Sequence, residues 1–335
     1  MIKFRTSRII QPLCFSKMTF FTDLQTLYDY LQLSTQDLSL STQASENFPL
    51  RVPKNFADRI EKGNSNDPLL RQILPIASEL ELHADFSNDP VGDLQAVKQI
   101  GVLHKYHGRV LLISTGACAI HCRYCFRRNF PYNDLQLSKQ QETQAIQAIA
   151  EDKTIEEVIL SGGDPLVLND ARLANLFEKL NAVSTLKRIR IHTRLPIVQP
   201  ERVTAELLDI FKTCPKKIVL VVHCNHPHEI NNEVAQACEK LKNAKVTLLN
   251  QSVLLQGVND DATILCELSE QLFEIGVLPY YLHFLDKAHG TAHFQVSKVK
   301  ALEIMTTMQN SLSGYLVPKL VFEQAGQLSK QPLCN

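Results

Sequence analysis

The feature that most constrains the fold of this chain is an alternation of short apolar runs with segments of helical periodicity. Six runs rich in β-branched and aliphatic residues span residues 109–114, 156–160, 187–193, 217–223, 245–251 and 279–285. Segments with the spacing of amphipathic helices lie between them, for example at residues 170–180 and 229–242. Successive strands that are separated by a helix pair in parallel rather than as hairpins. The chain is therefore predicted to be an α/β protein, built as a parallel barrel or partial barrel of β/α units.

Polar residues follow each run, at the point where the predicted strand ends. A cysteine-containing loop follows the first run, Gly162, Gly163 and Asp164 follow the second, and His192 and Arg194 close the third. The last three runs are followed by His223 and His226, by Asn250 and Gln251, and by Asp286. Because the carboxyl ends of the strands in a β/α barrel meet at one rim, we expect these residues to lie around a single site.

The cysteine-containing loop reads GACAIHCRYCFRRNF over residues 116–130 and holds Cys118, Cys122 and Cys125. The C-x3-C-x2-C spacing suits three thiolates that bind three irons of one cubic 4Fe-4S cluster. With no fourth cysteine in the run, one iron remains open to a substrate or cofactor. A zinc site is the alternative, but structural zinc favours two separated pairs of ligands, and no second C-x2-C pair occurs in the chain.

Composition and charge limit the kinds of partner that this chain is expected to bind. The chain has 335 residues, of which 44% are apolar, and this suffices for one large domain with an appendage. Basic and acidic residues number 35 each, so net charge gives no basis for binding nucleic acid or an anionic membrane. No stretch reaches transmembrane length, and we expect a small-molecule substrate. Nine cysteines, an odd number, without a secretory signal argue against a disulfide framework and predict a reducing, cytoplasmic location.

The chain is predicted to have four parts. Residues 1–48 form a variable N-terminal segment, partly disordered or helical, in which residues 34–48 are predicted to be a loop or linker. Met18 is a possible initiator, so residues 1–17 need not belong to the native protein. Residues 49–104 form a small helical region, with short helices near residues 56–62 and 68–73. The β/α core spans residues 105–295, and residues 296–335 form a C-terminal segment.

The cysteine spacing, with Tyr124 directly before the last cysteine, resembles that of the radical S-adenosylmethionine (SAM) enzymes. Further motifs, in the same order over about residues 50–333, resemble the lysine 2,3-aminomutase family. They are LHKYHGRVLL, CRYCFRRNFP, LSGGDPL, HCNHPHEI, NQSVLLQGVND, PYYLHFLDKAHGTAHF, SGYLVPKL and SKQPL. The resemblance implies the radical SAM partial (β/α)6 TIM-type barrel. The end of the chain, five residues after Lys330, fits the short members that make (R)-β-lysine for elongation factor P.

The resemblance also implies two cofactors besides the 4Fe-4S cluster held by Cys118, Cys122 and Cys125. Gly162, Gly163 and Asp164 match the site for the methionine part of SAM, although a GGDP sequence alone also forms simple turns. Gln251 either faces SAM or is a hydrogen-bonded core residue. Lys330 matches the lysine that binds pyridoxal 5'-phosphate (PLP), although the preceding AGQLS departs from the glycine-rich run of longer members. Arg109 and Lys105 match cations that hold the PLP phosphate, and Arg109 has a structural ion pair as its alternative.

The implied substrate is L-lysine, whose carboxylate and distant ammonium group require a cation and an anion in the site. Arg127 matches the family's carboxylate-binding arginine, and Asp286 matches the partner of the ammonium group. Glu323 is either a second acid of the site or a surface carboxylate. The rim histidines and Tyr280 and Tyr281 either orient cofactors or fill space.

The resemblance predicts an isomerase that moves the amino group of L-lysine from carbon 2 to carbon 3. An aminomutase acting on another amino acid such as glutamate, or a PLP-independent radical SAM modifying enzyme, is the alternative. The expected partners are a flavodoxin- or ferredoxin-type electron donor and an elongation factor P ligase that receives the product. A homo-oligomer is a further expectation.

Overall fold

The computed structural model of this chain describes residues 19–34, 41–135 and 137–334. The predictions about residues 1–17 and Met18 lie outside these ranges. Among the described residues, no helix is both long and apolar enough to cross a membrane.

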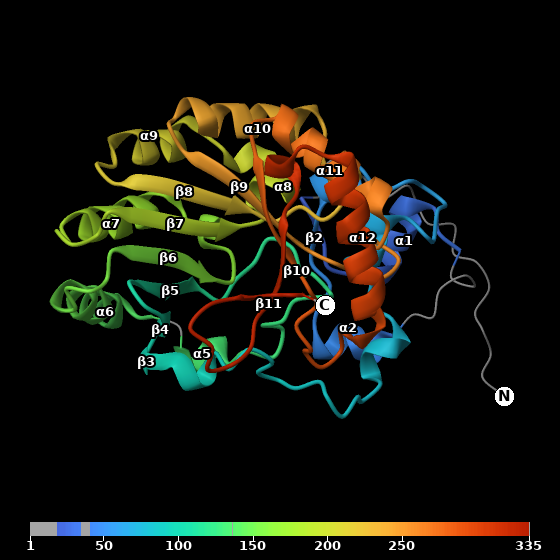
Figure 1. Cartoon of the computed structure of the whole chain (residues 1–335), viewed down its shortest axis with the longest axis horizontal. Coiled ribbons are helices and arrows are strands. Elements are labelled where there is room, and N and C mark those ends of the chain that lie inside the picture. The colour runs from blue at the N-terminus through green and yellow to red at the C-terminus, as the bar shows by residue number, and fades with distance from the viewer. Residues whose placement is uncertain (1–18, 35–40, 136, 335) are drawn as a thin grey trace.

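A ten-stranded sheet forms the centre of the molecule (Figure 1). Its strand order is β12-β11-β10-β9-β8-β7-β6-β5-β4-β3. The six predicted strands are β5 (Arg109–Thr115), β6 (Glu157–Gly162), β7 (Arg188–Thr193), β8 (Lys217–Val222), β9 (Thr247–Val253) and β10 (Leu278–His283). Consecutive strands among these six pair in parallel, which confirms the predicted α/β architecture. In the described part of the chain β3 and β12 remain edge strands that do not pair with each other, so the barrel is partial.

The sheet extends beyond the six predicted strands on both sides. The parallel strand β11 (Lys319–Phe322) and the antiparallel strand β12 (Gln331–Pro332) follow β10. On the other side, β3 (Val97–Gln99) and β4 (Val102–Tyr106) form antiparallel pairs that lead into β5. Lys330 lies directly before β12, which pairs with β11 at one edge of the sheet.

Helices cover the outer side of the sheet (Figure 1). They are α6 (Lys139–Glu151), α7 (Asp170–Asn181), α9 (Ala205–Thr213), α10 (Asn232–Asn243), α11 (Ala262–Glu274) and α12 (Lys298–Ser311), with the short helices α5 (Tyr132–Leu135) and α8 (Leu195–Val198) in the loops. In α7 the buried residues Leu173, Leu176, Phe177 and Leu180 recur with the helical period and form one apolar stripe. The side chain of Asn169 accepts a hydrogen bond from the Arg172 amide and caps this helix.

The alternation of side chains along each strand separates the helix-covered face from an inner face. In β7, Ile189 and Ile191 are fully buried in the hydrophobic core. Arg190 and His192, which alternate with them along the strand, line an internal cavity. Successive side chains of a strand point to opposite faces, so a strand of this kind supplies core residues and cavity residues in turn. The inner face of the sheet, and not only the rim at the strand ends, therefore contributes to the site.

The N-terminal region packs against the same core as the sheet. It contains β1 (Phe20–Phe21), α1 (Leu24–Leu31), α2 (Thr42–Asn47), β2 (Val52–Pro53), α3 (Lys54–Ala57) and α4 (Pro68–Arg71). Tyr28, Phe56 and Leu69 belong to the hydrophobic cluster that also holds the strand residues Ile189 and Leu220. The four-part division of the chain stays a prediction.

The expectation of a loop over residues 34–48 is wrong for α2. Ser41 caps this helix by accepting a hydrogen bond from the Ala44 amide. The guanidinium of Arg123 donates to the carbonyl oxygens of Ala44 at 3.1 Å and of Phe48 at 2.5 Å. The stretch has no apolar periodicity, and its helix is instead fixed by a side chain that lies far along the sequence. Tertiary contacts of this kind override local propensity.

Candidate active site

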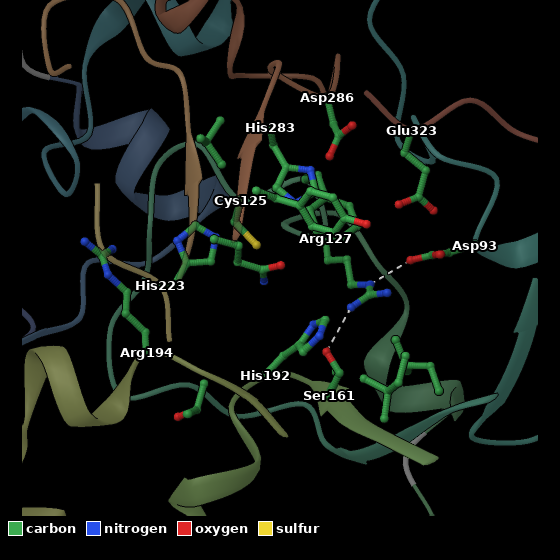
Figure 2. Close-up of a pocket in the computed structure, with 18 of the residues that line it drawn as sticks. Asp93, Cys125, Arg127, Ser161, His192, Arg194, His223, His283, Asp286 and Glu323 are labelled. Carbon is green, nitrogen blue, oxygen red and sulfur yellow. Dashed lines mark hydrogen bonds and ion pairs between the residues drawn. The ribbon is translucent and has the colours of Figure 1, made fainter. Parts of the chain in front are cut away.

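One cavity of about 350 Å³ opens on the inner face of the sheet, a volume typical of small-molecule sites. His226 and Asn250, which were also expected around the site, do not line this cavity, whereas every residue that the family resemblance assigned to the cluster, the cofactors or the substrate does. These residues are Cys118, Cys122, Cys125, Gly162, Gly163, Asp164, Gln251, Arg127, Asp286, Glu323, Lys105, Arg109 and Lys330. Figure 2 shows part of this wall, with charged groups and imidazole rings facing a common space. The structure therefore brings together residues that are spread over more than 200 positions of the chain.

The cysteine loop lies between β5 and α5 and is fastened to the N-terminal region. The guanidinium Nε of Arg51 donates to the carbonyl oxygen of Cys118 at 3.0 Å, and the Arg123 amide donates to the carbonyl oxygen of Gln72 at 2.9 Å. The fully buried side chain of Arg123 pairs with the carboxylate of Glu79, and Arg128 pairs with the same carboxylate at 2.6 Å. A carboxylate that joins two buried guanidiniums fixes the path of the loop.

Gly162 and Gly163 allow the strand end β6 to approach the cysteine loop. The Gly163 amide donates to the carbonyl oxygen of Thr115 at 2.7 Å, and the Asp164 amide donates to that of Ala117 at 2.8 Å. A Cβ on Gly163 would lie 2.2 Å from the Ala117 carbonyl oxygen, and Gly162 has a φ of 110°. Only glycine fits both requirements.

The carboxylate of Asp164 is fully used within the protein. Its Oδ1 accepts hydrogen bonds from the Thr193 hydroxyl at 2.6 Å and the Leu166 amide at 3.0 Å, and its Oδ2 accepts from the Arg194 and Leu195 amides at 2.8 and 3.2 Å. Burial raises the pKa of Asp164, while these hydrogen bonds favour its ionised form. Asp164 thus ties the end of β6 to the end of β7.

A chain of ion pairs crosses one side of the cavity. Asp93 accepts from Arg127 Nε at 2.6 Å (Figure 2). Asp93 also pairs with Lys105 Nζ at 2.6 Å, and Lys105 pairs with Glu323 at 2.8 Å. Glu323 pairs in turn with Lys330 Nζ at 2.6 Å. Glu323 is therefore a residue of the cavity and not a surface carboxylate. Sequence reasoning missed Asp93, because it lies in an irregular stretch before the sheet where no pattern marks it.

The two acids on this side of the cavity have opposite pKa shifts. Burial opposes the ionisation of Glu323, but the ammonium groups of Lys330 and Lys105 outweigh it and hold the pKa of Glu323 at about 2. Burial raises the pKa of Asp286 to about 7, although Lys330 acts in the opposite direction. The protein thus supplies too little positive charge near Asp286 to offset the burial of its ionised carboxylate. A bound cation would supply this positive charge.

Arg109 lies at the start of β5, on the inner face, with its guanidinium carbon 4.7 Å from the centre of the Tyr106 ring. No carboxylate of the described residues forms an ion pair with it, which removes the alternative of a structural ion pair. Arg109 therefore presents a cation to the cavity without an internal counter-ion.

Three imidazole rings line the cavity, from the buried His283 and the half-buried His192 and His223 (Figure 2). Burial lowers the pKa of each ring, to about 3 for His223, so the rings are neutral near pH 7. Two further histidines have structural contacts: His226 Nδ1 accepts from the His228 amide, and His121 bonds to the Pro49 carbonyl oxygen. The sequence analysis did not assign His283. Its two-residue spacing from Tyr281 in β10 places both on the inner face and is the signal that could have found it.

Comparison with known proteins decides the family. The model of the Radical SAM superfamily matches residues 112–265. L-lysine 2,3-aminomutase of Escherichia coli K12 is 47% identical over 313 residues, which cover 93% of this chain and 91% of that protein. The enzyme of the same name from Haemophilus influenzae is 47% identical over 309 residues, covering 92% and 91%. That of Clostridium subterminale is 34% identical over 311 residues, covering 92% and 74%.

The chain belongs to the L-lysine 2,3-aminomutase family. It is an isomerase of the radical SAM superfamily, as the cysteine spacing and the ordered motifs indicated. Membership of this superfamily implies a 4Fe-4S cluster and SAM.

The cysteine loop of this aminomutase-family chain fits such a cluster. Cys118, Cys122 and Cys125 are free thiols that line the cavity. Burial, and then the neighbouring cysteines, raise the pKa of Cys118 and bring that of Cys125 to about 11. Within the described residues no three Cys, His, Asp or Glu side chains converge on a point that would hold one metal ion. Cluster ligands need not converge in this way, because each sulfur binds a different iron. Uptake of iron would have to release the thiol protons.

Proposed function

We propose that this chain is a PLP-dependent radical SAM aminomutase that converts L-lysine to (R)-β-lysine by 2,3-amino migration. The observation that carries the proposal is that the three thiols, the Lys330 amine, the Arg127 guanidinium and the carboxylates of Asp286 and Glu323 line one cavity. Each is a group that such a reaction requires. The names of the relatives, L-lysine 2,3-aminomutase in each case, support the same substrate.

The charges of the cavity suit a molecule with a carboxylate at one end and an ammonium group at the other. Figure 2 shows the carboxylates of Asp286 and Glu323 together and the guanidinium of Arg127 apart from them. In our proposal Arg127 binds the substrate carboxylate, and Asp286, assisted by Glu323, binds the distant ammonium group. Asp93 is a positioning residue, since it accepts a hydrogen bond from Nε of Arg127, while Nη1 of the same side chain donates to Ser161 Oγ at 3.3 Å.

Lys330 and Arg109 are the residues that we assign to the binding of PLP. A lysine amine is the usual attachment point for this cofactor, which would supply a conjugated system able to delocalise an unpaired electron. Arg109, which has no acidic partner among the described residues, would hold the dianionic phosphate. Lys105 already pairs with Asp93 and Glu323, so its part in phosphate binding would require these ion pairs to rearrange.

SAM is assigned to the side of the cavity formed by the cysteine loop and the end of β6. The Gly163 amide is already bonded to Thr115 at the end of β5, and the Asp164 amide to Ala117 of the cysteine loop, so any contact of this stretch with the methionine amino group falls to carbonyl oxygens. Gln251 lines the same cavity from β9, which favours its assignment toward SAM over that of a core glutamine. A flavodoxin- or ferredoxin-type protein would supply the electron that starts SAM cleavage.

The fate of the product is the most specific part of the proposal. The chain matches the Escherichia coli relative over 91% of that protein's length and the Clostridium subterminale relative over 74%. The chain is also more similar to the Escherichia coli relative (47% identical) than to the Clostridium subterminale relative (34%), and on this basis we propose that its (R)-β-lysine is attached to elongation factor P by a ligase.

The test is anaerobic reconstitution with iron, sulfide, SAM, PLP and a chemical reductant, followed by chiral analysis of the amino acid formed from L-lysine. We expect (R)-β-lysine and a visible absorption band from bound PLP. Lys330→Ala should remove both the band and the product. Lys319→Ala, at an exposed lysine of β11 in the same C-terminal segment, is the matched control and should keep both. Product from L-glutamate but not from L-lysine, or full activity without PLP, would contradict the proposal.

A further inference from the structure

A buried arginine contacts one of the three cysteine sulfurs directly. Arg194 follows β7, and its side chain is only 6% exposed. Its Nη1 donates to Sγ of Cys122 at 2.7 Å. In Figure 2, Arg194 lies on the opposite side of the cavity from the substrate-facing Arg127. Its position therefore associates it with the cysteine loop and not with the ion-pair chain of Asp93 and Glu323.

The orientation of Arg194 is fixed by several independent contacts. Its Nη2 donates to Gln72 Oε1 at 2.6 Å and to Glu229 Oε2 at 2.8 Å. The guanidinium carbon lies 5.6 Å from the centre of the Tyr124 ring and 5.2 Å from that of Phe56. A guanidinium that is held by hydrogen bonds and aromatic faces on several sides cannot turn away from the sulfur without losing these contacts.

Glu229 is the counter-ion of this arginine and is itself completely buried. Besides Arg194 it accepts hydrogen bonds from Gln72 Nε2 at 3.1 Å and from the amides of Asn225 and His226 at 2.9 and 3.2 Å. Burial opposes its ionisation, but Arg194 and these donors lower the pKa of Glu229, so it stays an anion. The charge that Cys122 experiences is thus set by a buried cation with a buried anion behind it.

Cys118 and Cys125 differ from Cys122 in this respect. No side chain of the described residues donates a hydrogen bond to the sulfur of either cysteine. Cys122 alone of the three receives a charged side-chain donor among the described residues. Hydrogen bonds to the sulfurs and the net charge around a cluster determine its reduction potential, because an added electron increases the negative charge on the thiolates.

We infer that Arg194 is a positioning residue that raises the reduction potential of the 4Fe-4S cluster through Cys122, and that Glu229 limits this effect. The reaction concerned is the one-electron reduction of the cluster by the external donor, in which Arg194 and Glu229 keep their charges. The inference rests on the cluster that membership of the radical SAM superfamily implies, and not on the identity of the amino-acid substrate. The two residues should therefore act on the potential with opposite signs.

The test is a redox titration of reconstituted protein without substrate or PLP, followed by the electron paramagnetic resonance signal of the reduced cluster. For Arg194→Gln, the ratio of reduced to oxidised cluster at a fixed potential should fall about tenfold, which is about 59 mV for one electron. For Glu229→Gln, which keeps the shape of the side chain, the ratio should rise. Arg202→Gln is the matched control, because Arg202 donates to the carbonyl oxygens of Leu166 and Leu168 and does not line the cavity.

Opposite shifts support the inference, because a merely structural defect would not change sign between the two variants. An unchanged potential in either variant, or shifts of the same sign, would overturn it. If Arg194→Gln fails to bind iron, the Glu229→Gln titration decides alone, and an unchanged or lowered potential there is the contradicting result. Failure of amino migration in the wild-type protein would refute the proposed function without affecting these potentials.

Discussion

Replacing Asp286 by asparagine should impair the use of L-lysine far more than it impairs SAM cleavage. The side chain keeps its shape in Asp286→Asn but loses the charge that we assign to the substrate ammonium group. Burial raises the pKa of Asp286 from 3.8 to about 7, which corresponds to about 4 kcal/mol against ionisation. An ammonium group that pairs with the carboxylate would recover much of this free energy.

The size of the effect follows from the cost of leaving a desolvated charge without its partner. Truncating one member of such a pair typically costs about 2–5 kcal/mol. We therefore expect kcat/KM for L-lysine to fall by about two to three orders of magnitude in Asp286→Asn, since about 1.4 kcal/mol corresponds to a factor of ten. Formation of 5'-deoxyadenosine from SAM under reductant without lysine should stay within about twofold of wild type, an estimate that follows because no transition-state contact to SAM is removed.

The pH dependence gives a second, independent readout. Because the pKa of Asp286 is raised, the carboxylate is mostly protonated at pH 6 and mostly ionised at pH 8. The lysine side-chain ammonium, with an ordinary pKa of about 10.4, stays charged over this range. Lysine should thus bind the wild-type protein about tenfold more tightly at pH 8 than at pH 6, and Asp286→Asn should lack this difference.

The assay is the initial rate of β-lysine formation over a range of lysine concentrations at several pH values, with 5'-deoxyadenosine measured in parallel. Asp209→Asn, at a side chain that is 70% exposed, serves as the matched control and should behave like wild type. The assignment of Asp286 is refuted if the variant loses lysine-independent SAM cleavage as severely as lysine turnover, or if it keeps the wild-type KM for lysine.

Two further substitutions test the geometry of the cavity. Gly163→Ala should prevent iron uptake while circular dichroism shows a folded sheet, because the new Cβ would lie 2.2 Å from a backbone oxygen of the cysteine loop; Gly314→Ala, where nothing lies within 4 Å, should bind iron normally. Normal iron content in Gly163→Ala would contradict this argument. Glu323→Gln should lower the free energy of unfolding at pH 7 by up to about 3 kcal/mol, since the pKa of Glu323 is lowered from 4.5 to about 2. A lowered carboxyl pKa stabilises the folded state above pH 4.5 and loses this effect toward pH 2. In denaturant titrations the difference in free energy of unfolding between variant and wild type should therefore shrink as the pH falls. A difference that stays constant with pH would disprove the assignment.

The cysteine loop and the strand ends could be predicted because each is encoded locally. The spacing of Cys118, Cys122 and Cys125 is a property of eight consecutive residues, and the six parallel strands appear as apolar runs within two residues of their actual ends. Gly162 and Gly163 could be located in the same way, directly after a strand. Their requirement for glycine, however, comes from the approach of Ala117, a contact between two loops that no local pattern reports.

Only some of the cavity residues on the inner face of the sheet were predicted, because the prediction used the residues at the strand ends and not those within the strands. Ser161, Arg190 and His283, which were not predicted, line the cavity from positions inside β6, β7 and β10. Alternation along these strands contains the signal, since cavity residues and core residues exchange at every position. These cavity residues could therefore have been predicted from the alternation of side chains along the strands.

By itself the sequence determined the order of the β/α units, the spacing of the three cysteines and, through its resemblance, the family. Only the tertiary structure decided which charges meet. Arg194 contacts Cys122 across 72 positions and Lys105 contacts Glu323 across 218. Such pairs are set by how the sheet curves and by which acids and bases lose water together, and the burial that results also determines their protonation. Sequence periodicity reports the local period of a helix or strand, and it carries no information about these long-range contacts.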